Sequence, residues 1–117
     1  MRLYHLTWQS HVRSISRRGI IPNHRPNGWG PISLLHSKKG VFLCERWRVA
    51  VWEHSLRWRM YSHPGGRGDV VCISINPKHI KAYKDKRKSS FETFDGDWIC
   101  SHRIPPKDIR ILKRFPQ

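Results

Sequence analysis

Three side chains that lie far apart in the chain are suited to ligand binding and acid-base chemistry. They are His5 near the start, Phe42 in the middle and Asp97 near the end, and each falls in or beside a short segment that reads as a strand. Imidazoles and carboxylates hydrogen-bond substrates and move protons, and an aromatic ring stacks against flat ligands. We expect the three segments to deliver these groups to one place in the fold.

The elements that must position these groups are short strands and two helices. Alternating or β-branched apolar runs predict strands at 2–7, 41–44, 69–76, 78–83, 98–104 and 109–115. The segment 78–83 is predicted to be a turn followed by a short strand. The connections after residue 68 are too short for helical crossovers, so the sheets should be mostly antiparallel. A chain of 117 residues is expected to form a single α+β domain, residues 1–117.

Both predicted helices lie in the first half of the chain, separated by a long loop at 23–39 whose Pro and Gly residues give no sustained periodicity. The first helix runs from Ser10, as N-cap, to Gly19, and the second occupies 45–59. In the second helix the expected inward residues are Trp47, Ala50, Val51 and Trp58, and the expected outward ones are Arg46, Arg48, Glu53 and Arg57.

The charge balance is strongly basic, with 23 Lys and Arg against 8 Asp and Glu and a formal net charge of +15. Such a surface attracts polyanions and holds them by counterion release, so nucleic acid is the first candidate partner. An acidic protein partner, or solubility alone, would also account for the charge. Charge by itself does not identify the polyanion.

The cysteines and apolar runs limit the other classes of protein. Cys44, Cys72 and Cys100 lie in apolar stretches and cannot all pair within the chain, so we expect buried thiols and a reducing, cytoplasmic compartment. Close Cys spacings of the zinc type do not occur, so a metal site is not expected. No apolar run approaches the roughly 20 residues that a membrane span needs, and no membrane partner is expected.

An ordered set of motifs covers nearly the whole chain. It begins with Tyr4-His5-Leu6-Thr7, a helix ending at 19–22 (Gly-Ile-Ile-Pro), 40–43 (Gly-Val-Phe-Leu) followed by a helix bearing Ala50, and a central apolar strand, and it ends with an acidic strand leading into 104–109 (Ile-Pro-Pro-Lys-Asp-Ile). In order and spacing this set resembles the ADP-ribosyltransferase superfamily, in the branch with a His, an aromatic and an acidic or amide residue. The resemblance implies a split pair of small, mostly antiparallel sheets with an NAD cleft between them.

The resemblance also implies roles for individual residues. His5, supported by Thr7, would hydrogen-bond the adenosine-side ribose of NAD, and Phe42 would stack on the nicotinamide. Asp97 would bond the other ribose and oppose the positive charge that develops as the bond to nicotinamide breaks. The pyrophosphate would lie near three arginines that flank the first helix and the long loop, namely Arg17, Arg18 and Arg25, with His24 beside them.

Alternative interpretations remain for each of these residues. His5 could instead be a structural strand histidine, although the binding role is the favoured interpretation. Phe42 stands where this branch usually carries Tyr, so the hydroxyl is missing and the ring could be an ordinary core residue. Asp97 could belong to a turn before a strand, with Glu92 or Asp95 as the acidic residue instead.

The acceptor of a transferase has to be inferred separately from its donor site. Trp residues interleaved with Arg suit unpaired bases and phosphates, although most Trp fill cores. Trp29, in the Gly- and Pro-rich loop, is the expected exposed aromatic. The other expected nucleic-acid contacts are basic residues of the second helix and of two loops: Arg46, Arg48, Arg57, Arg59, Arg67, Lys84, Lys86, Arg87 and Lys88.

The leading hypothesis is an NAD-dependent ADP-ribosyltransferase that modifies a nucleic acid, single-stranded DNA or RNA, or a protein bound to one, similar to the toxins that modify DNA. The alternative is a weakened or inactive domain of the same fold that binds nucleic acid or a protein that reads it, as an inhibitor of host defence would. An antitoxin or a host defence protein is a further possible partner. An RNA 2′-phosphotransferase ranks last, because the His and Arg motifs of that family are not evident.

Overall fold

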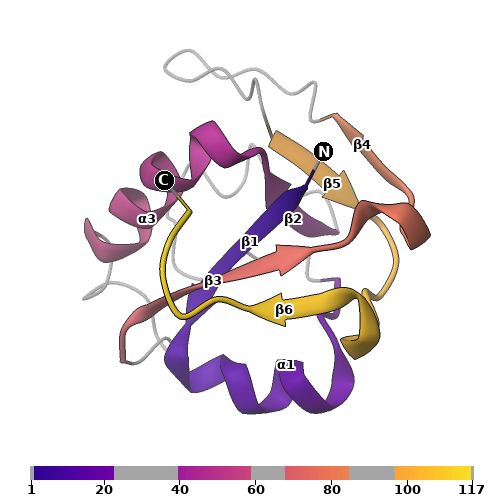
Figure 1. The fold of residues 1–117 in the computed structure, drawn as a ribbon, viewed down its shortest axis with the longest axis horizontal. Helices are drawn as coiled ribbons and strands as arrows, with labels where there is room; N and C mark the ends of the chain where they lie inside the picture. The colour runs from indigo at the N-terminus through magenta and orange to yellow at the C-terminus, as the bar shows by residue number, and fades with distance from the viewer. Residues whose placement is uncertain (1, 23–39, 59–67, 85–96, 117) are drawn as a thin grey trace.

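The computed structural model describes residues 2–22, 40–58, 68–84 and 97–116, with the side chain of Trp58 excepted. In this part of the chain six strands form one antiparallel sheet in the order β4-β5-β2-β1-β3-β6 (Figure 1). The strands are β1 (Leu3–Trp8), β2 (Val41–Cys44), β3 (Val70–Ile75), β4 (Ala82–Lys84), β5 (Asp97–Cys100) and β6 (Ile109–Ile111). The fold is therefore α+β, as the sequence predicts.

The sheet consists of two three-stranded halves. β1 pairs with β3 over six residues and β2 pairs with β5 over four, whereas within the described strands β1 and β2 share a single register pair, Tyr4 with Cys44. The halves β4-β5-β2 and β1-β3-β6 thus meet at a narrow seam. The predicted pair of separate sheets was wrong in this respect, because one hydrogen-bonded pair makes the sheet continuous.

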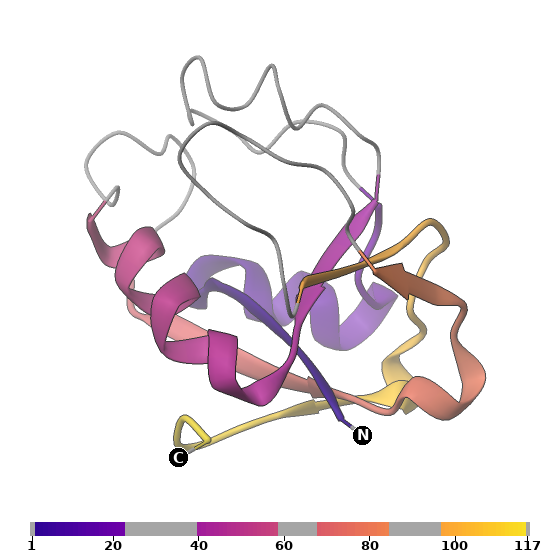
Figure 2. The same ribbon diagram turned by 90° about the horizontal axis from the view of Figure 1, so that it is seen from above.

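Two helices pack on opposite faces of this sheet, α1 (Val12–Arg18) and α3 (Val49–Trp58); in Figure 2, α3 lies in front of α1. A short 3-10 turn precedes each helix, at Gln9–His11 and at Arg46–Arg48. The predicted N-cap at Ser10 was wrong, because Ser10 lies inside the first 3-10 turn and the cap position falls at His11.

Gly19 ends α1 as predicted, with a positive φ of 80°. The next residue, Ile20, is buried and forms an isolated antiparallel bridge with Ile104, the two residues exchanging backbone hydrogen bonds of 2.9 and 3.0 Å. A Cβ atom at Gly19 would lie 2.1 Å from the carbonyl oxygen of Ile104. Glycine is therefore required by its own backbone and by the close approach of a second chain segment.

The core follows the alternation of the strands. On the α1 face, Leu3, Leu43, Ile73 and Ile75 pack together with Ile15 of the helix. On the α3 face, the buried residues are Tyr4, Trp8, Cys44, Val49, Leu56, Val70 and Cys72. Each face of the sheet therefore buries an apolar layer of its own.

The phase of α3 differs from the predicted one. Val49 and Leu56 are its buried residues, and Trp52 packs beside them, an i, i+3, i+7 pattern typical of one helix face. Three of the predicted inward residues are exposed instead: Trp47, Ala50 and Val51. The prediction failed because the 3-10 turn at 46–48 places Trp47 before the α-helix begins, so a period counted from it has the wrong phase.

Candidate functional site

The candidate residues come from three neighbouring strands. Tyr4 of β1 pairs with Cys44 of β2, and Cys44 pairs in turn with Asp97 of β5, so one row of residues crosses the seam. His5 follows Tyr4, and Phe42 lies two residues before Cys44. The sheet order β5-β2-β1 thus brings together three segments that are distant in sequence.

His5 is fixed by a hydrogen bond across the seam. Its Nδ1 lies 2.9 Å from the backbone oxygen of Phe42, just beyond the paired residues Tyr4 and Cys44. Because a carbonyl oxygen only accepts, Nδ1 must carry the proton. Burial lowers the pKa of the imidazole below its usual value, so the ring is neutral at pH 7 and its Nε2 is a hydrogen-bond acceptor.

Strand alternation places His5 and Asp97 on opposite faces. His5 shares the face of Leu3 and α1, whereas Phe42, Cys44 and Asp97 share the α3 face, because directly paired residues point the same way. A ligand that contacts all three candidate side chains would therefore have to cross the seam between β1 and β2. It cannot lie on one face of the sheet.

Asp97 is the first residue of β5, not part of a preceding turn, and its carboxylate is anchored to the start of α3. Arg48 donates to it twice, from Nη2 to Oδ2 at 3.2 Å and from Nε to Oδ1 at 3.4 Å. Trp52 donates its indole N–H to Oδ1 at 2.9 Å. The side chains of Arg48 and Asp97 are 15% and 5% exposed, so the pair is largely removed from water.

Arg48 and Trp52 were missed as partners of Asp97 by the sequence analysis, which placed Arg48 on the outer surface. A buried carboxylate requires a compensating cation and hydrogen-bond donors, and that rule could have indicated a cationic partner. No local pattern selects Arg48 as that partner, because it lies 49 residues from Asp97 in the chain.

The supporting residues are less distinctive. Thr7 is buried and shares the face of His5, since it lies two residues further along β1. Phe42 is half-buried on β2. Arg17 and Arg18 are exposed in the last turn of α1, and the backbone oxygen of Arg18 accepts a 2.6 Å hydrogen bond from Arg103.

The predicted nucleic-acid contacts divide into three groups. Arg46 and Lys84 are exposed, whereas Arg48 is committed to Asp97, which corrects its prediction as an outward residue. Arg57, 44% exposed, is paired with Glu53 and Asp69. The remaining predicted site residues and the acidic alternatives lie outside the described residues: His24, Arg25, Trp29, Arg59, Arg67, Lys86, Arg87, Lys88, Glu92 and Asp95.

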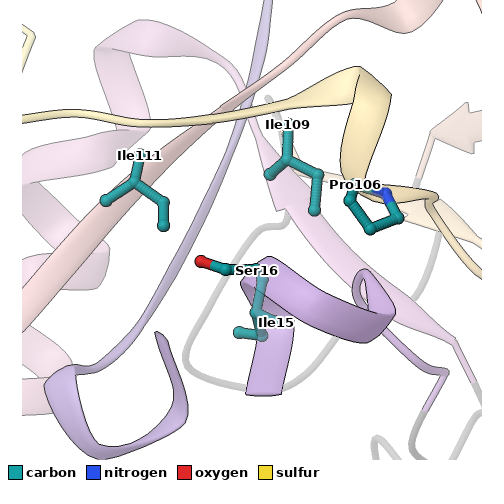
Figure 3. A pocket seen from close by; sticks show the side chains of 5 residues that line it. All are labelled: Ile15, Ser16, Pro106, Ile109 and Ile111. Atoms are coloured by element: carbon teal, nitrogen blue, oxygen red, sulfur yellow. The ribbon is translucent and has the colours of Figure 1, made fainter. Parts of the chain in front are cut away.

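A pocket of about 230 Å³ opens between α1 and β6 (Figure 3). Ile15, Ile109 and Ile111 line it together with Pro106 and Ser16, so its wall combines apolar side chains with polar atoms in similar measure. None of the candidate site residues borders it. The pocket is therefore separate from the seam.

The described residues contain no group of three His, Cys, Asp or Glu side chains that could hold a metal ion. The three cysteines are buried and unpaired, as predicted, and burial raises the pKa of each thiol, that of Cys72 to about 12. Such thiols are protonated at pH 7 and are poor nucleophiles. Within the described ranges, no helix has the length and apolar character needed to span a membrane.

Comparisons of the chain with protein family models, curated protein sequences and solved structures gave no match.

Proposed function

We propose that this protein is an NAD-dependent ADP-ribosyltransferase that acts on a nucleic acid or on a protein associated with one. The observation that carries the proposal is the state of His5. The neutral imidazole donates its Nδ1–H to the Phe42 carbonyl, which leaves Nε2 as a hydrogen-bond acceptor on a residue beside the seam between β1 and β2. A ribose hydroxyl is a donor that such a nitrogen can hold.

The residues around the seam match NAD in chemical type, and an NAD molecule that contacted all of them would extend across the seam from the His5 face to the Asp97 face. His5 and Thr7 would hold the adenosine-side ribose, the ring of Phe42 would face the nicotinamide, and Asp97 would hold the second ribose. NAD supplies the ADP-ribosyl group when its bond to nicotinamide breaks. The protein contributes binding and orientation, and the carboxylate contributes a fixed negative charge.

The ion pair with Arg48 limits what Asp97 contributes. A carboxylate whose charge is balanced by a guanidinium at 3.2 Å opposes a developing cation less strongly than an unpaired one. It keeps a fixed orientation, because Trp52 and Arg48 hold both oxygens. Its proposed role is accordingly to position the ribose more than to stabilise charge.

The test is transfer of label from adenylate-labelled NAD to oligonucleotides or lysate proteins, with nicotinamide release measured in parallel. We expect transfer by the wild type and at least a tenfold loss in His5→Ala and in Asp97→Asn. His54→Ala is the matched control, since His54 is exposed on α3 and should leave transfer unchanged. Undiminished transfer in His5→Ala would show that the site is wrong.

A second candidate function is a binding module that retains this fold without transfer. Two observations favour it: Phe42 lacks the hydroxyl of the usual Tyr, and the charge of Asp97 is balanced by Arg48. In that case NAD would neither raise the melting temperature nor release nicotinamide, whereas affinity for single-stranded DNA would fall steeply with salt. Affinity that stays flat between low and physiological salt would exclude this function too.

A further inference from the structure

Trp47 is the most exposed large apolar side chain in the described part of the chain, with 61% of its surface accessible. It lies in the 3-10 turn Arg46–Arg48, between β2 and α3. An indole left in water at such a junction contributes little to the core. Core packing explains the buried Trp8, but it does not explain the exposed Trp47, so a binding role has to be considered.

The exposed ring is held in place. Its indole N–H donates to Oε1 of Glu45 at 3.3 Å, and Oε2 of the same carboxylate accepts the indole N–H of Trp98 at 2.8 Å. One carboxylate therefore orients two indoles from different segments of the chain. A ring fixed before binding loses little conformational entropy when a ligand stacks on it.

Cations surround this pair of rings. The guanidinium of Arg48 lies 5.7 Å from the centroid of the Trp47 ring, and the ammonium of Lys84 lies 5.8 Å from that of Trp98. Arg46, next to Trp47, is exposed. We name Glu45, Arg46, Trp47, Lys84 and Trp98 the indole patch. A fixed aromatic ring among cations is the arrangement that binds unpaired bases and their phosphates.

Arg48 connects the indole patch to the candidate site. The same guanidinium that lies over Trp47 donates to Asp97 at 3.2 Å. A base stacked on Trp47 would thus lie one side chain away from the carboxylate proposed to hold the ribose of NAD.

We infer that the indole patch binds an unpaired base of a single-stranded nucleic acid, with Trp47 as the stacking platform, and so presents the acceptor to the site at Asp97. That the bound base is the acceptor of ADP-ribose rests on the proposed function, but binding of the base to Trp47 does not require NAD. The net charge of +15 favours a polyanion over an apolar or cationic partner.

The experiment measures fluorescence anisotropy of labelled 12-nucleotide strands with the full-length chain at fixed salt, without NAD. The strands are oligothymidine, oligouridine and a DNA strand of the same length and charge that lacks bases. Loss of one stacked base predicts that Trp47→Ala binds oligothymidine about 5- to 150-fold more weakly. Trp47→Phe should recover most of the affinity, and the strand without bases should bind wild type and Trp47→Ala equally.

Ile111→Ala is the matched control, because it removes an exposed apolar side chain at the opposite edge of the sheet and should leave binding unchanged. Equal affinity of wild type and Trp47→Ala for oligothymidine would overturn the inference, as would equal weakening on the strand without bases. Failure to bind any strand, with lysate proteins retained instead, would replace the nucleic acid by a protein partner and also overturn it. Tighter binding of oligothymidine would indicate DNA as the natural ligand, and tighter binding of oligouridine would indicate RNA.

These outcomes are distinct from those of the proposed function. A protein that stacks bases on Trp47 but releases no nicotinamide supports the indole patch and refutes the transferase. A protein that consumes NAD but binds strands independently of Trp47 does the reverse.

Discussion

Replacing Arg48 by Met tests whether the buried ion pair with Asp97 holds the start of α3 to the sheet. Methionine keeps much of the length and volume of the arginine stem but removes the charge and all the donors. The Asp97 carboxylate would then remain largely buried, with the Trp52 indole N–H still donating to it. The loss of the cation beside a buried carboxylate is the main cost that we expect.

The magnitude follows from two lost hydrogen bonds to a charged group. Such bonds contribute about 1.5 to 3 kcal/mol each, and the distances of 3.2 and 3.4 Å favour the lower value. The sum, about 3 kcal/mol, agrees with the lower end of the range for breaking a buried pair. For a chain of this size that is a large share of the free energy of unfolding.

The assay is urea unfolding at pH 7, followed by far-ultraviolet circular dichroism. Arg57→Met is the matched control, because Arg57 also bonds two acidic side chains but is 44% exposed, and its pairs with Glu53 and Asp69 face solvent. That variant should lose about 1 kcal/mol or less. Arg48→Met should lose roughly three times as much.

A double variant makes the reasoning refutable. Asp97→Asn added to Arg48→Met removes the buried negative charge while keeping the side-chain shape, so it should restore part of the lost stability. Equal losses in Arg48→Met and Arg57→Met, or a further loss in the double variant, would show that the pair does not stabilise the fold through charge compensation.

Two further predictions concern His5 and Gly19. The pKa of His5 is lowered in the folded state, so the unfolded chain binds a proton first as the pH falls, and the free energy of unfolding should decrease below about pH 6.5. The melting temperature should therefore change less between pH 7.5 and pH 5 in His5→Asn than in the wild type. An equal change in both proteins would contradict a neutral buried imidazole. Gly19→Ala should cost about 3 kcal/mol or more in urea unfolding, because its Cβ would lie 2.1 Å from the backbone oxygen of Ile104. Gly68→Ala, with a similar φ of 82° and a nearest contact of 2.9 Å to the Cβ of Gln9, should cost less, and equal costs would mean that the approach of Ile104 does not matter.

The strands were predictable because their patterns are local. The β-branched run predicted at 69–76 became Val70–Ile75, and 41–44 was predicted at its observed bounds. The last strand ended earlier than predicted, at Ile111, although the backbone N–H of Leu112 still donates to Cys72 of β3 at 3.0 Å. The periodicity of apolar residues was sufficient to predict the bounds of strands that pair along their full length.

The geometry of the candidate site was less accessible from the sequence. That β5, β2 and β1 are neighbours depends on long-range pairing, and the partner of Asp97 depends on where α3 starts relative to β2. Trp47 was expected in the core because tryptophan usually lies there, whereas it is 61% exposed beside the exposed Arg46. Residue type predicts burial only on average, and Trp47, at the junction between β2 and α3, is an exposed exception.

The narrow seam between β1 and β2 has a mechanical consequence. Since one backbone pair joins the two halves of the sheet, the rest of their attachment depends on side chains: the apolar layer on each face, which contains residues of both halves, and the hydrogen bond from the His5 imidazole to the Phe42 carbonyl. His5 is thus both a residue proposed for binding and a contact between the halves. A substitution at His5 should therefore change the stability of the fold together with ligand affinity.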